Sequence, residues 1–475
     1  MSSSSPQPIN SEVSALDALI NSQDQSIRFQ AAWWLGKHRI YRAGHILCEC
    51  LKDEKDRTAL GGYPLRRQAA RSLGLLKFKD AVPELIEALK CSDSKVQEAA
   101  ILALKDIGDA SAANALTEFL CIQTANKPYE ALIETLAAFK AWNAKEQIEP
   151  FLLDKSERIN GAAAAYFYSL TSNPFYLEKL QENLGNENPF VRNAAAFDLA
   201  TLGKFEAAAT IINANVPNNI KLATLKQILE SILLSKQEAA KNANKNGDFL
   251  LQTIDNLTLD AVEGNIQRMS NAEIDKQAAD LQELTSKFRI DSKQAPDSIS
   301  LALIEATKSS HTKVKAAAIQ GLIDLAPISI HAITESLEND KDQDLQACLI
   351  QALAIIGDPK SLPLFEKAIG LEIANHCQGK IRRVAARGLG KIASEAKDED
   401  LRSQAIKKLQ WTLKNPDDWA LRYSAVISLE SIKSSEIISI LKDATKDESD
   451  LTVQTRIKKA VRIAEKYKLN SRSEH

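Results

Sequence analysis

The stretch "GGYPLRRQAARSLGLL", residues 61–76, predicts an amphipathic helix. Pro64 suits the first helical turn, where a missing N–H costs no hydrogen bond. Apolar side chains recur every three or four residues and form one stripe along Leu65, Ala69, Leu73 and Leu76. Arg67 and Arg71 lie on another face, one turn apart, where two like charges repel by roughly 0.2–0.5 kcal/mol. The doubled charge therefore needs an explanation outside this helix.

The same pattern recurs along the chain, with an aliphatic residue, a small residue four later and a large apolar residue eight later. Copies are "IRFQAAWWL" (27–35), "VQEAAILAL" (96–104), "VRNAAAFDL" (191–199), "VKAAAIQGL" (314–322), "IRRVAARGL" (381–389) and "LRYSAVISL" (421–429). The last positions are 31 or 32 residues apart along Leu73, Leu104, Leu136, Phe167 and Leu199. A fixed period of about 30 residues, built from two short helices, is typical of a solenoid. The sequence therefore predicts an all-α, HEAT-like solenoid with helix-pair repeats of about 31 residues.

The pattern weakens in one polar, Asn-rich part of the chain, which fits either degenerate repeats or a helical insert between two arrays. We expect five segments: a disordered N-terminus at 1–11, an N-terminal HEAT-like array at 12–234, a degenerate helical bridge at 235–297, a C-terminal HEAT-like array at 298–466 and a tail at 467–475.

Composition excludes several classes of protein. The chain has 475 residues, and its 60 basic and 62 acidic residues leave a net charge of −2, so no global attraction to nucleic acid is expected. No stretch approaches the ~20 apolar residues of a membrane span. The start, "MSSSSPQPIN", lacks the apolar core of a signal peptide. We expect a cytoplasmic protein whose six cysteines are reduced.

Comparing the copies separates structural from functional positions. The position after the first aliphatic residue is cationic in most copies, as Arg28, Arg66, Arg192, Lys315, Arg382 and Arg422. A cation that recurs from repeat to repeat is best explained as a contact that ties neighbouring elements together through carboxylates or carbonyls. Arg66 and Arg382 are therefore poor candidates for a ligand site.

The next position, and the one four later, vary between copies. In stacked helix pairs this face of the second helix lines the concave surface. It carries two arginine pairs, Arg67 with Arg71 and Arg383 with Arg387, and aromatic residues lie at or near the same positions, namely Phe29, Trp33, Trp419 and Tyr423. We interpret the pairs as anion-binding, with salt bridges to acidic residues or simple solvation as the alternatives. Glycines beside the pairs, at 74, 388 and 390, indicate that some group approaches the backbone closely.

The chain shows no nucleophilic triad, P-loop or dinucleotide motif. His38, His45 and Cys48 have spacings at which a metal site can be imagined, but we favour buried packing residues and expect no metal. Asp418 is placed to cap the helix that begins at Trp419. A carboxylate beside Trp419 and Tyr423 would also suit a flat ligand with N–H donors.

Four stretches carry a resemblance to a known family. They are "QAAWWLGKHR" (30–39), "YPLRRQAARSLG" (63–74), "CQGKIRRVAARGLGKI" (377–392) and "DDWALRYSAVISLE" (417–430). In these stretches the sequence resembles the E/F-type phycobilin lyases, HEAT-like solenoids of cyanobacteria and red-algal plastids. Its length resembles the longer phycoerythrin-directed members, which combine both halves in one polypeptide.

The resemblance implies a bilin lyase that attaches phycoerythrobilin by a thioether to a cysteine of a phycoerythrin subunit, with the alpha subunit as the expected acceptor. Some members also isomerise the bilin to phycourobilin. The bilin is then a substrate, and no tightly bound cofactor is expected. The nucleophile belongs to the partner subunit. The alternative is a non-enzymatic HEAT-repeat scaffold or chaperone that binds a protein partner on its concave face.

The resemblance also assigns roles to the variable positions. A bilin carries two propionates, which suit the two arginine pairs, because a charge-assisted hydrogen bond contributes roughly 1.5–3 kcal/mol. The expected bilin-binding residues are Arg67, Arg71, Arg383, Arg387, Trp33, Tyr63, Trp419 and Tyr423. Asp418 is the candidate catalytic residue, since its carboxylate could stabilise positive charge on the bilin nitrogens.

Overall fold

The structure is a computed structural model that describes residues 9–122, 126–235, 240–261, 271–287, 297–370, 379–414, 418–432 and 434–473. Within these ranges every regular element is a helix, so the predicted all-α solenoid is confirmed. The chain divides into two compact units, Met1–Leu202 (unit 1) and Gly203–His475 (unit 2). The repeat pattern placed the end of the first array later, at 234. Ser11 caps the first helix, whereas residues 1–8 of the expected disordered N-terminus lie outside the described residues.

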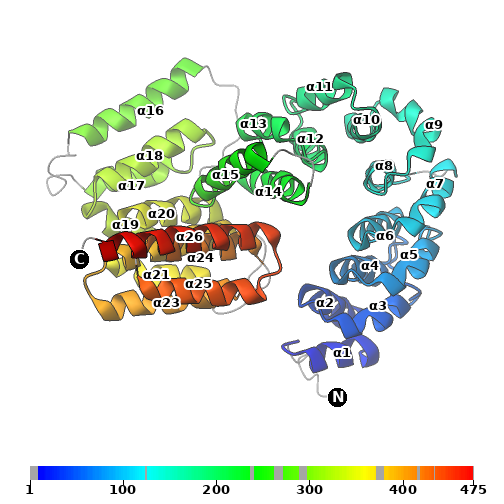
Figure 1. The fold of residues 1–475 in the computed structure, drawn as a ribbon, viewed down its shortest axis with the longest axis horizontal. Coiled ribbons are helices and arrows are strands. Elements are labelled where there is room, and N and C mark those ends of the chain that lie inside the picture. Colours follow the sequence, from blue (N-terminus) through cyan, green and yellow to red (C-terminus); the bar gives the residue numbers. More distant parts are fainter. Residues whose placement is uncertain are drawn as a thin grey trace. The chain divides into compact units, whose positions relative to one another are not determined.

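Unit 1 is built from helix pairs, and Figure 1 shows their second helices on the inside of a curve. These second helices form the inner row of unit 1, made of α2 (Gln25–Lys37), α4 (Pro64–Leu76), α6 (Ser94–Ile107), α8 (Tyr129–Ala138), α10 (Glu157–Thr171) and α12 (Pro189–Thr201). The first helices are α1 (Glu12–Asn21), α3 (Gly44–Cys50), α5 (Val82–Ala88), α7 (Ala113–Cys121), α9 (Lys145–Ile148) and α11 (Pro174–Asn183).

Unit 2 repeats this arrangement. Its inner row is α16 (Asn271–Ser286), α18 (Thr312–Asp324), α20 (Gln343–Ile356), α22 (Gly379–Glu395), α24 (Trp419–Ser431) and α26 (Leu451–Ser473). The first helices are α17 (Asp297–Ala306), α19 (Ile328–Asn339), α21 (Leu362–Ile369), α23 (Glu399–Leu413) and α25 (Ser435–Asp447). Three helices precede this array, namely α13 (Phe205–Asn213), α14 (Asn218–Leu234) and α15 (Ala240–Leu257).

Short 3₁₀ segments lead into or follow some of the first helices. They are η1 (Tyr41–Ala43), η2 (Lys79–Ala81), η3 (Ala110–Ala112), η4 (Trp142–Ala144), η5 (Glu149–Leu153) and η7 (Pro359–Ser361). All of these except η5, which follows α9, give the chain a tight entry into the next helix.

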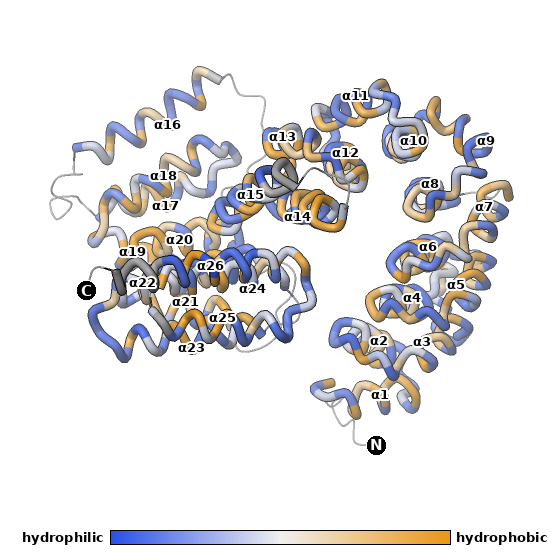
Figure 2. Tube along the Cα trace, viewed as in Figure 1, coloured by the Kyte–Doolittle hydropathy of each residue, from blue (hydrophilic) through white to orange (hydrophobic). Residues whose placement is uncertain are grey.

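Helix α4 shows why the repeat forms. Pro64 occupies its first turn, as predicted, and Lys77 ends it in a left-handed conformation with φ of 51°. Leu65, Ala69 and Leu73 are fully buried, and burying one leucine contributes about 1.5–3 kcal/mol. Figure 2 shows hydrophobic residues returning turn by turn along the helices between hydrophilic ones. Each helix therefore has one face for packing and one that is free for other contacts.

The recurrent cations cap the C-terminal end of the helix that precedes them in the chain. The Nε atoms of Arg28, Arg66 and Arg382 donate to the carbonyl oxygens of residues 19, 53 and 369 at 3.1, 2.8 and 2.8 Å. These carbonyls lie at or just after helix ends, where they lack helical partners. Where a copy has no cation, an amide donates instead, as Gln97 does to Cys91 at 2.8 Å. The structural role predicted for Arg66 and Arg382 is confirmed.

The glycines beside the arginine pairs allow neighbouring helices to pack closely. A Cβ on Gly74 would lie 3.0 Å from the Cα of Ala103 in α6. A Cβ on Gly390 would lie 2.4 Å from the Cβ of Ser428 in α24, and one on Gly388 would lie 2.5 Å from the ring of Phe365 in α21. The group that approaches the backbone is therefore another part of the solenoid.

Among the described residues, none of the helices combines the length and the apolar character needed to cross a membrane.

Candidate functional site

The two arginines of the opening stretch lie on the inner row of unit 1 with unused hydrogen-bonding capacity. Arg67 is half-buried, and its Nε is buried without a hydrogen-bond partner. Arg71, one turn further along α4, is exposed. Within the described residues neither guanidinium forms an ion pair or a side-chain hydrogen bond. Salt bridges, the first alternative, are therefore not formed by these two cations within the described residues, although the charge of Arg67 acts on the buried carboxyl of Asp56. Simple solvation, the second alternative, agrees with the exposure of Arg71.

Apolar side chains occupy the register of Arg71 in other helices of this row, including α2 and α6, the two neighbours of α4. The position of Arg71 in the repeat is taken by Trp33 in α2, Leu102 in α6 and Phe197 in α12. These three side chains are 39%, 38% and 40% exposed. Lys37 Nζ lies 4.6 Å from the centre of the Trp33 ring, which is a cation–π contact. The inner row thus presents apolar surface in the same register as two cations that form no ion pair among the described residues, a combination that suits an apolar ligand with carboxylates.

Tyr63 is held by other residues at the start of α4. It is 6% exposed, and its hydroxyl lies 3.0 Å from a carboxylate oxygen of Glu54. This hydrogen bond raises the pKa of Tyr63. The Arg66 guanidinium lies over its ring at 4.2 Å. Only a small edge of Tyr63 is open to a ligand, and its predicted role in bilin binding stays a prediction.

Further along the inner row of unit 1 the same two positions carry carboxylates, paired with Lys105 and Arg158, a feature that our interpretation of the sequence missed. The positions of Arg67 and Arg71 are taken in α8 by Glu130 and Glu134. Behind them Asp198 is 6% exposed, and burial, followed by repulsion from Glu134 and Glu130, raises its pKa well above the usual value. The sequence did contain a signal for this feature, namely the acidic residues Glu130 and Glu134 at the variable positions of the repeat.

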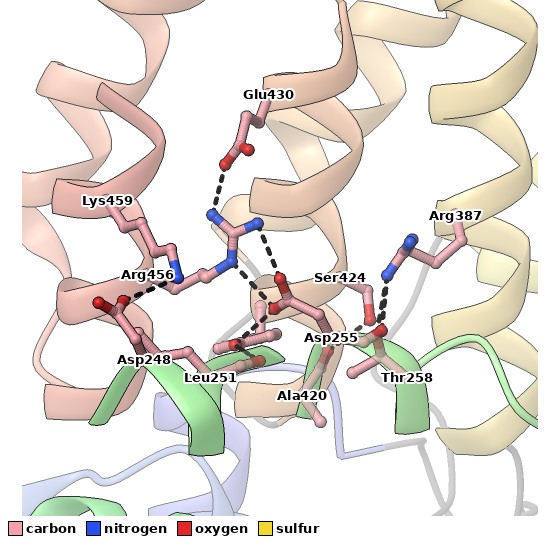
Figure 3. A network of polar contacts seen from close by, with 11 residues as sticks. Asp248, Leu251, Asp255, Thr258, Arg387, Ala420, Ser424, Glu430, Arg456 and Lys459 are labelled. Atoms are coloured by element: carbon pink, nitrogen blue, oxygen red, sulfur yellow. Dashed lines mark hydrogen bonds and ion pairs between the residues drawn. The ribbon is translucent and has the colours of Figure 1, made fainter. Parts of the chain in front are cut away.

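In unit 2 the inner row is covered by a segment of the same chain. Arg387 of α22 donates through Nη1 to the backbone oxygen of Asp255 at 2.9 Å and to Oγ1 of Thr258 at 3.1 Å. The Tyr423 hydroxyl lies 2.7 Å from Oδ1 of Asp255. Arg456 of α26 binds both carboxylate oxygens of Asp255, at 3.0 and 3.1 Å, and also pairs with Glu430 (Figure 3).

Burial sets the electrostatics of this cluster. Burial lowers the pKa of Arg387, and the charge of Asp255 opposes that shift. Burial also raises the pKa of Tyr423 well above its usual value, and Asp255 adds to the effect. For Arg456 burial disfavours the charge, but Asp255 and Glu430 outweigh it and raise the pKa. Both arginines are charged and the tyrosine is neutral at physiological pH.

The remaining predicted residues lie near the start of α24. Asp418 caps this helix, because its Oδ1 accepts from the backbone N–H groups of residues 420 and 421 at 2.9 and 3.1 Å. The predicted capping role is confirmed, and its catalytic role stays a prediction. Arg383 is 9% exposed, and a Cβ on Gly379 would contact both its Nη1 and Oδ2 of Asp418. Trp419 packs edge-on against Tyr423, with ring centres 6.0 Å apart.

Metal and thiol chemistry find no support in the described residues. No group of three potential ligands is arranged for a metal among them. His38 stacks on the ring of Trp34 at 3.9 Å, and His45 packs edge-on against Phe78 at 5.0 Å. Burial raises the pKa of Cys48 to about 12, and it raises those of Cys50 and Cys348 to about 11, so these thiols do not ionise near neutral pH. Asp417 and Cys377 lie outside the described residues.

Comparison with known proteins identifies the family. A model described as HEAT repeats matches residues 63–129, 300–372 and 370–462. The chain is 48% identical over 255 residues to the bilin biosynthesis protein PecE of Mastigocladus laminosus, covering 54% of this chain and 93% of that protein. It is 47% identical over 148 residues to PecF of the same organism, covering 31% of this chain and 70% of that protein.

A solved structure, the complex of CpcE and CpcF of phycocyanin lyase from Nostoc sp. PCC7120, shares 39% sequence identity with this chain. The match covers 53% of this chain and 99% of the matched chain of that structure, with a TM-score of 0.46.

The fold and its inner rows define a HEAT-repeat solenoid with cationic and apolar side chains on one face. The sequence identity to PecE, and the share of PecE that the match covers, identify the family within this class of solenoids. The chain belongs to the E/F-type family of HEAT-repeat phycobilin lyases, and the resemblance found in its sequence is confirmed.

Proposed function

We propose that this protein is a phycobilin lyase that binds an open-chain tetrapyrrole on the inner row of unit 1 and attaches it to a cysteine of a phycobiliprotein subunit. The observation that carries the proposal is that Arg67 and Arg71 form no ion pair among the described residues, while the exposed ring of Trp33 occupies the position of Arg71 on the neighbouring helix α2. A bilin offers carboxylates to the two arginines and a flat apolar body to the ring of Trp33. Membership of the lyase family supports the reaction class.

The chain's residues would act by binding and orienting the bilin. Arg67 and Arg71 hold a propionate, and each charged hydrogen bond contributes about 1.5–3 kcal/mol, more than the mutual repulsion of the two arginines costs. Trp33 packs against the conjugated rings and keeps water from one face of the bilin. Orientation of this kind removes much of the entropic cost of bringing thiol and bilin together.

The reaction itself is an addition. The thiol of the acceptor subunit adds across the ethylidene double bond of the bilin, so that a C–S bond forms and the thiol proton ends on the adjacent ring carbon. No oxidant or reductant is consumed. The acceptor supplies the nucleophile, which agrees with the raised pKa values of Cys48, Cys50 and Cys348. Asp418 is retained as the carboxylate that could stabilise charge on the bilin nitrogens, although its Oδ1 is engaged at the helix cap.

Three finer points extend the proposal. We propose phycoerythrobilin as the bilin and the alpha subunit of phycoerythrin as the acceptor, with isomerisation to phycourobilin as a further step. The support is the resemblance of the length and motifs to long phycoerythrin-directed members. We further propose that one polypeptide supplies both types of array, because relatives of both the PecE and the PecF type match this chain.

The experiment is co-expression of the chain with bilin-synthesis enzymes and the phycoerythrin alpha subunit. The purified subunit should absorb visible light, and the colour should survive acid urea because the chromophore is covalently bound. Omission of any second lyase protein tests the single-chain proposal. A colourless subunit would favour the alternative function, a scaffold or chaperone. That alternative draws support from the exposed apolar residues of the inner row, Trp33, Leu102 and Phe197, which would also suit a protein partner.

A further inference from the structure

Residues 248–261 lie across the inner row of unit 2 and contact four of its helices in order. Asp248 pairs with Lys459 of α26 at 2.9 Å. Asp255 binds the α24 and α26 side chains described above, and Thr258 binds α22. The backbone N–H of Ala261 then donates to Oε1 of Gln351 in α20 at 2.9 Å. Figure 3 shows the side chains of three of these helices converging on this segment.

The segment contacts those positions of the repeat that we expect to face a ligand. Three of its partners, Lys459, Arg387 and Gln351, occupy the repeat position that Arg71 occupies in α4. In α2, α4, α6 and α12 of unit 1 that position carries exposed side chains, Arg71 among them. The segment therefore covers in unit 2 a face whose counterpart is exposed in those four helices of unit 1.

The charges of the covered face match two carboxylates. Without the segment, the face holds three cations and one carboxylate, namely Arg387, Arg456, Lys459 and Glu430. Helix α15 supplies two carboxylates, Asp248 and Asp255, which are seven residues and hence about 10 Å apart along the helix. A bilin likewise brings two propionates on one extended molecule.

The Arg387 guanidinium adds a second sign of an incomplete site. Its two hydrogen bonds go to neutral oxygens, the Asp255 carbonyl and the Thr258 hydroxyl. Within the described residues it forms no ion pair, although it is half-buried and the charge of Asp255 acts on it from nearby. A half-buried cation whose hydrogen bonds go only to neutral oxygens is stabilised further when an anion binds it directly.

We propose that Arg387, Tyr423 and Arg456 form a carboxylate-binding site that holds Asp255 of the same chain in this conformation, and that a propionate of the bilin competes with Asp255 for it. The identity of the competing ligand rests on the proposed function. Helix α15 is then an internal occupant of the unit 2 face, and bilin binding there and docking of α15 exclude each other. A ligand shifts such an equilibrium only by its preference for one state, here the state with α15 undocked.

The first experiment is hydrogen exchange on the full-length chain, read by mass spectrometry on peptides from 245–258, with phycoerythrobilin and with its dimethyl ester. The free acid should speed exchange in α15, and the ester, which has no carboxylates, should not. The second compares Asp255→Asn with Asp443→Asn in a phycoerythrobilin titration. Asp443 pairs with Lys446 on the exposed side of α25, so its variant is a matched loss of one charge.

Asp255→Asn should bind phycoerythrobilin about tenfold more tightly than Asp443→Asn, because the internal competitor has lost its charge. The proposal is overturned if bound phycoerythrobilin leaves α15 exchange unchanged and both variants bind equally. If binding then still requires Arg67 and Arg71, and chromophore transfer occurs, the proposed function stands alone. If phycoerythrobilin frees α15 but no chromophore is transferred, the carboxylate site stands and the proposed function falls. Absence of any binding overturns both.

Discussion

Arg456 is the residue whose removal should most disturb the inner row of unit 2. It is 3% exposed, binds both oxygens of Asp255 at 3.0 and 3.1 Å and pairs with Glu430. Removing one partner of a buried ion pair costs about 3–5 kcal/mol, because the other charge is left uncompensated. Here the stranded carboxylates are 23% and 19% exposed, so water can reach them in part. We expect Arg456→Met to cost about 3 kcal/mol, the lower end of that range.

The assay is the free energy of local opening of α24 and α26, measured by native-state hydrogen exchange. Global denaturation is less suitable, because a chain of two units does not unfold in one step. If stranded charge is the cause, adding Asp255→Asn and Glu430→Gln to Arg456→Met should restore most of the loss. A cost below about 1 kcal/mol, or a triple variant as unstable as the single one, would refute this reasoning.

Three further predictions concern stability and reactivity. Burial raises the pKa of Asp198, so the folded protein keeps a proton that the unfolded chain releases. Stability therefore falls as pH rises from the pKa of Asp198 in the unfolded chain to its higher pKa in the folded protein. Asp198→Asn should remove this loss, with a gain in melting temperature that grows with pH over that range. Gly390→Ala should cost about 1–3 kcal/mol in the local opening of α22 and α24 measured by native-state hydrogen exchange, because its Cβ would overlap α24, whereas Gly247→Ala in α15, with 3.8 Å to its nearest neighbour, should not destabilise. Iodoacetamide at pH 8 should alkylate exposed Cys121 and leave Cys48, with its pKa of about 12, intact until the protein unfolds.

The repeat architecture was predictable because its causes are local. The aliphatic, small and large residues of each copy lie within nine residues, and they determine which face of a helix is buried. Comparison of copies then distinguished Arg66, which binds the chain's own carbonyls, from Arg67, which has unused hydrogen-bonding capacity. Helix caps such as Asp418 were equally accessible, since their partners lie two or three residues away.

The covering of the unit 2 inner row could not be predicted in the same way. Its contacts join residues 132 and 201 positions apart, Arg387 with Asp255 and Arg456 with Asp255. The segment that provides them lies where the repeat pattern is weakest, so no alignment of copies assigned it a partner. A signal was present in the spacing of its polar residues, since Asp248, Asp255 and Thr258 fall on one side of a helical turn pattern. Sequence reasoning treated the two arginine pairs as equivalent, whereas the structure leaves Arg71 exposed and engages Arg387.

The central claim, that the inner row of unit 1 binds the bilin through Arg67 and Arg71, is tested most directly by titrating phycoerythrobilin into single variants and following absorbance. Arg67→Gln and Arg71→Gln should each weaken binding by about 1.5–3 kcal/mol, with helicity and melting temperature close to those of the parent protein. Arg42→Gln, which removes an exposed arginine that pairs with Glu12, should leave the affinity unchanged. Equal affinities for the parent protein, both inner-row variants and the control would contradict the account.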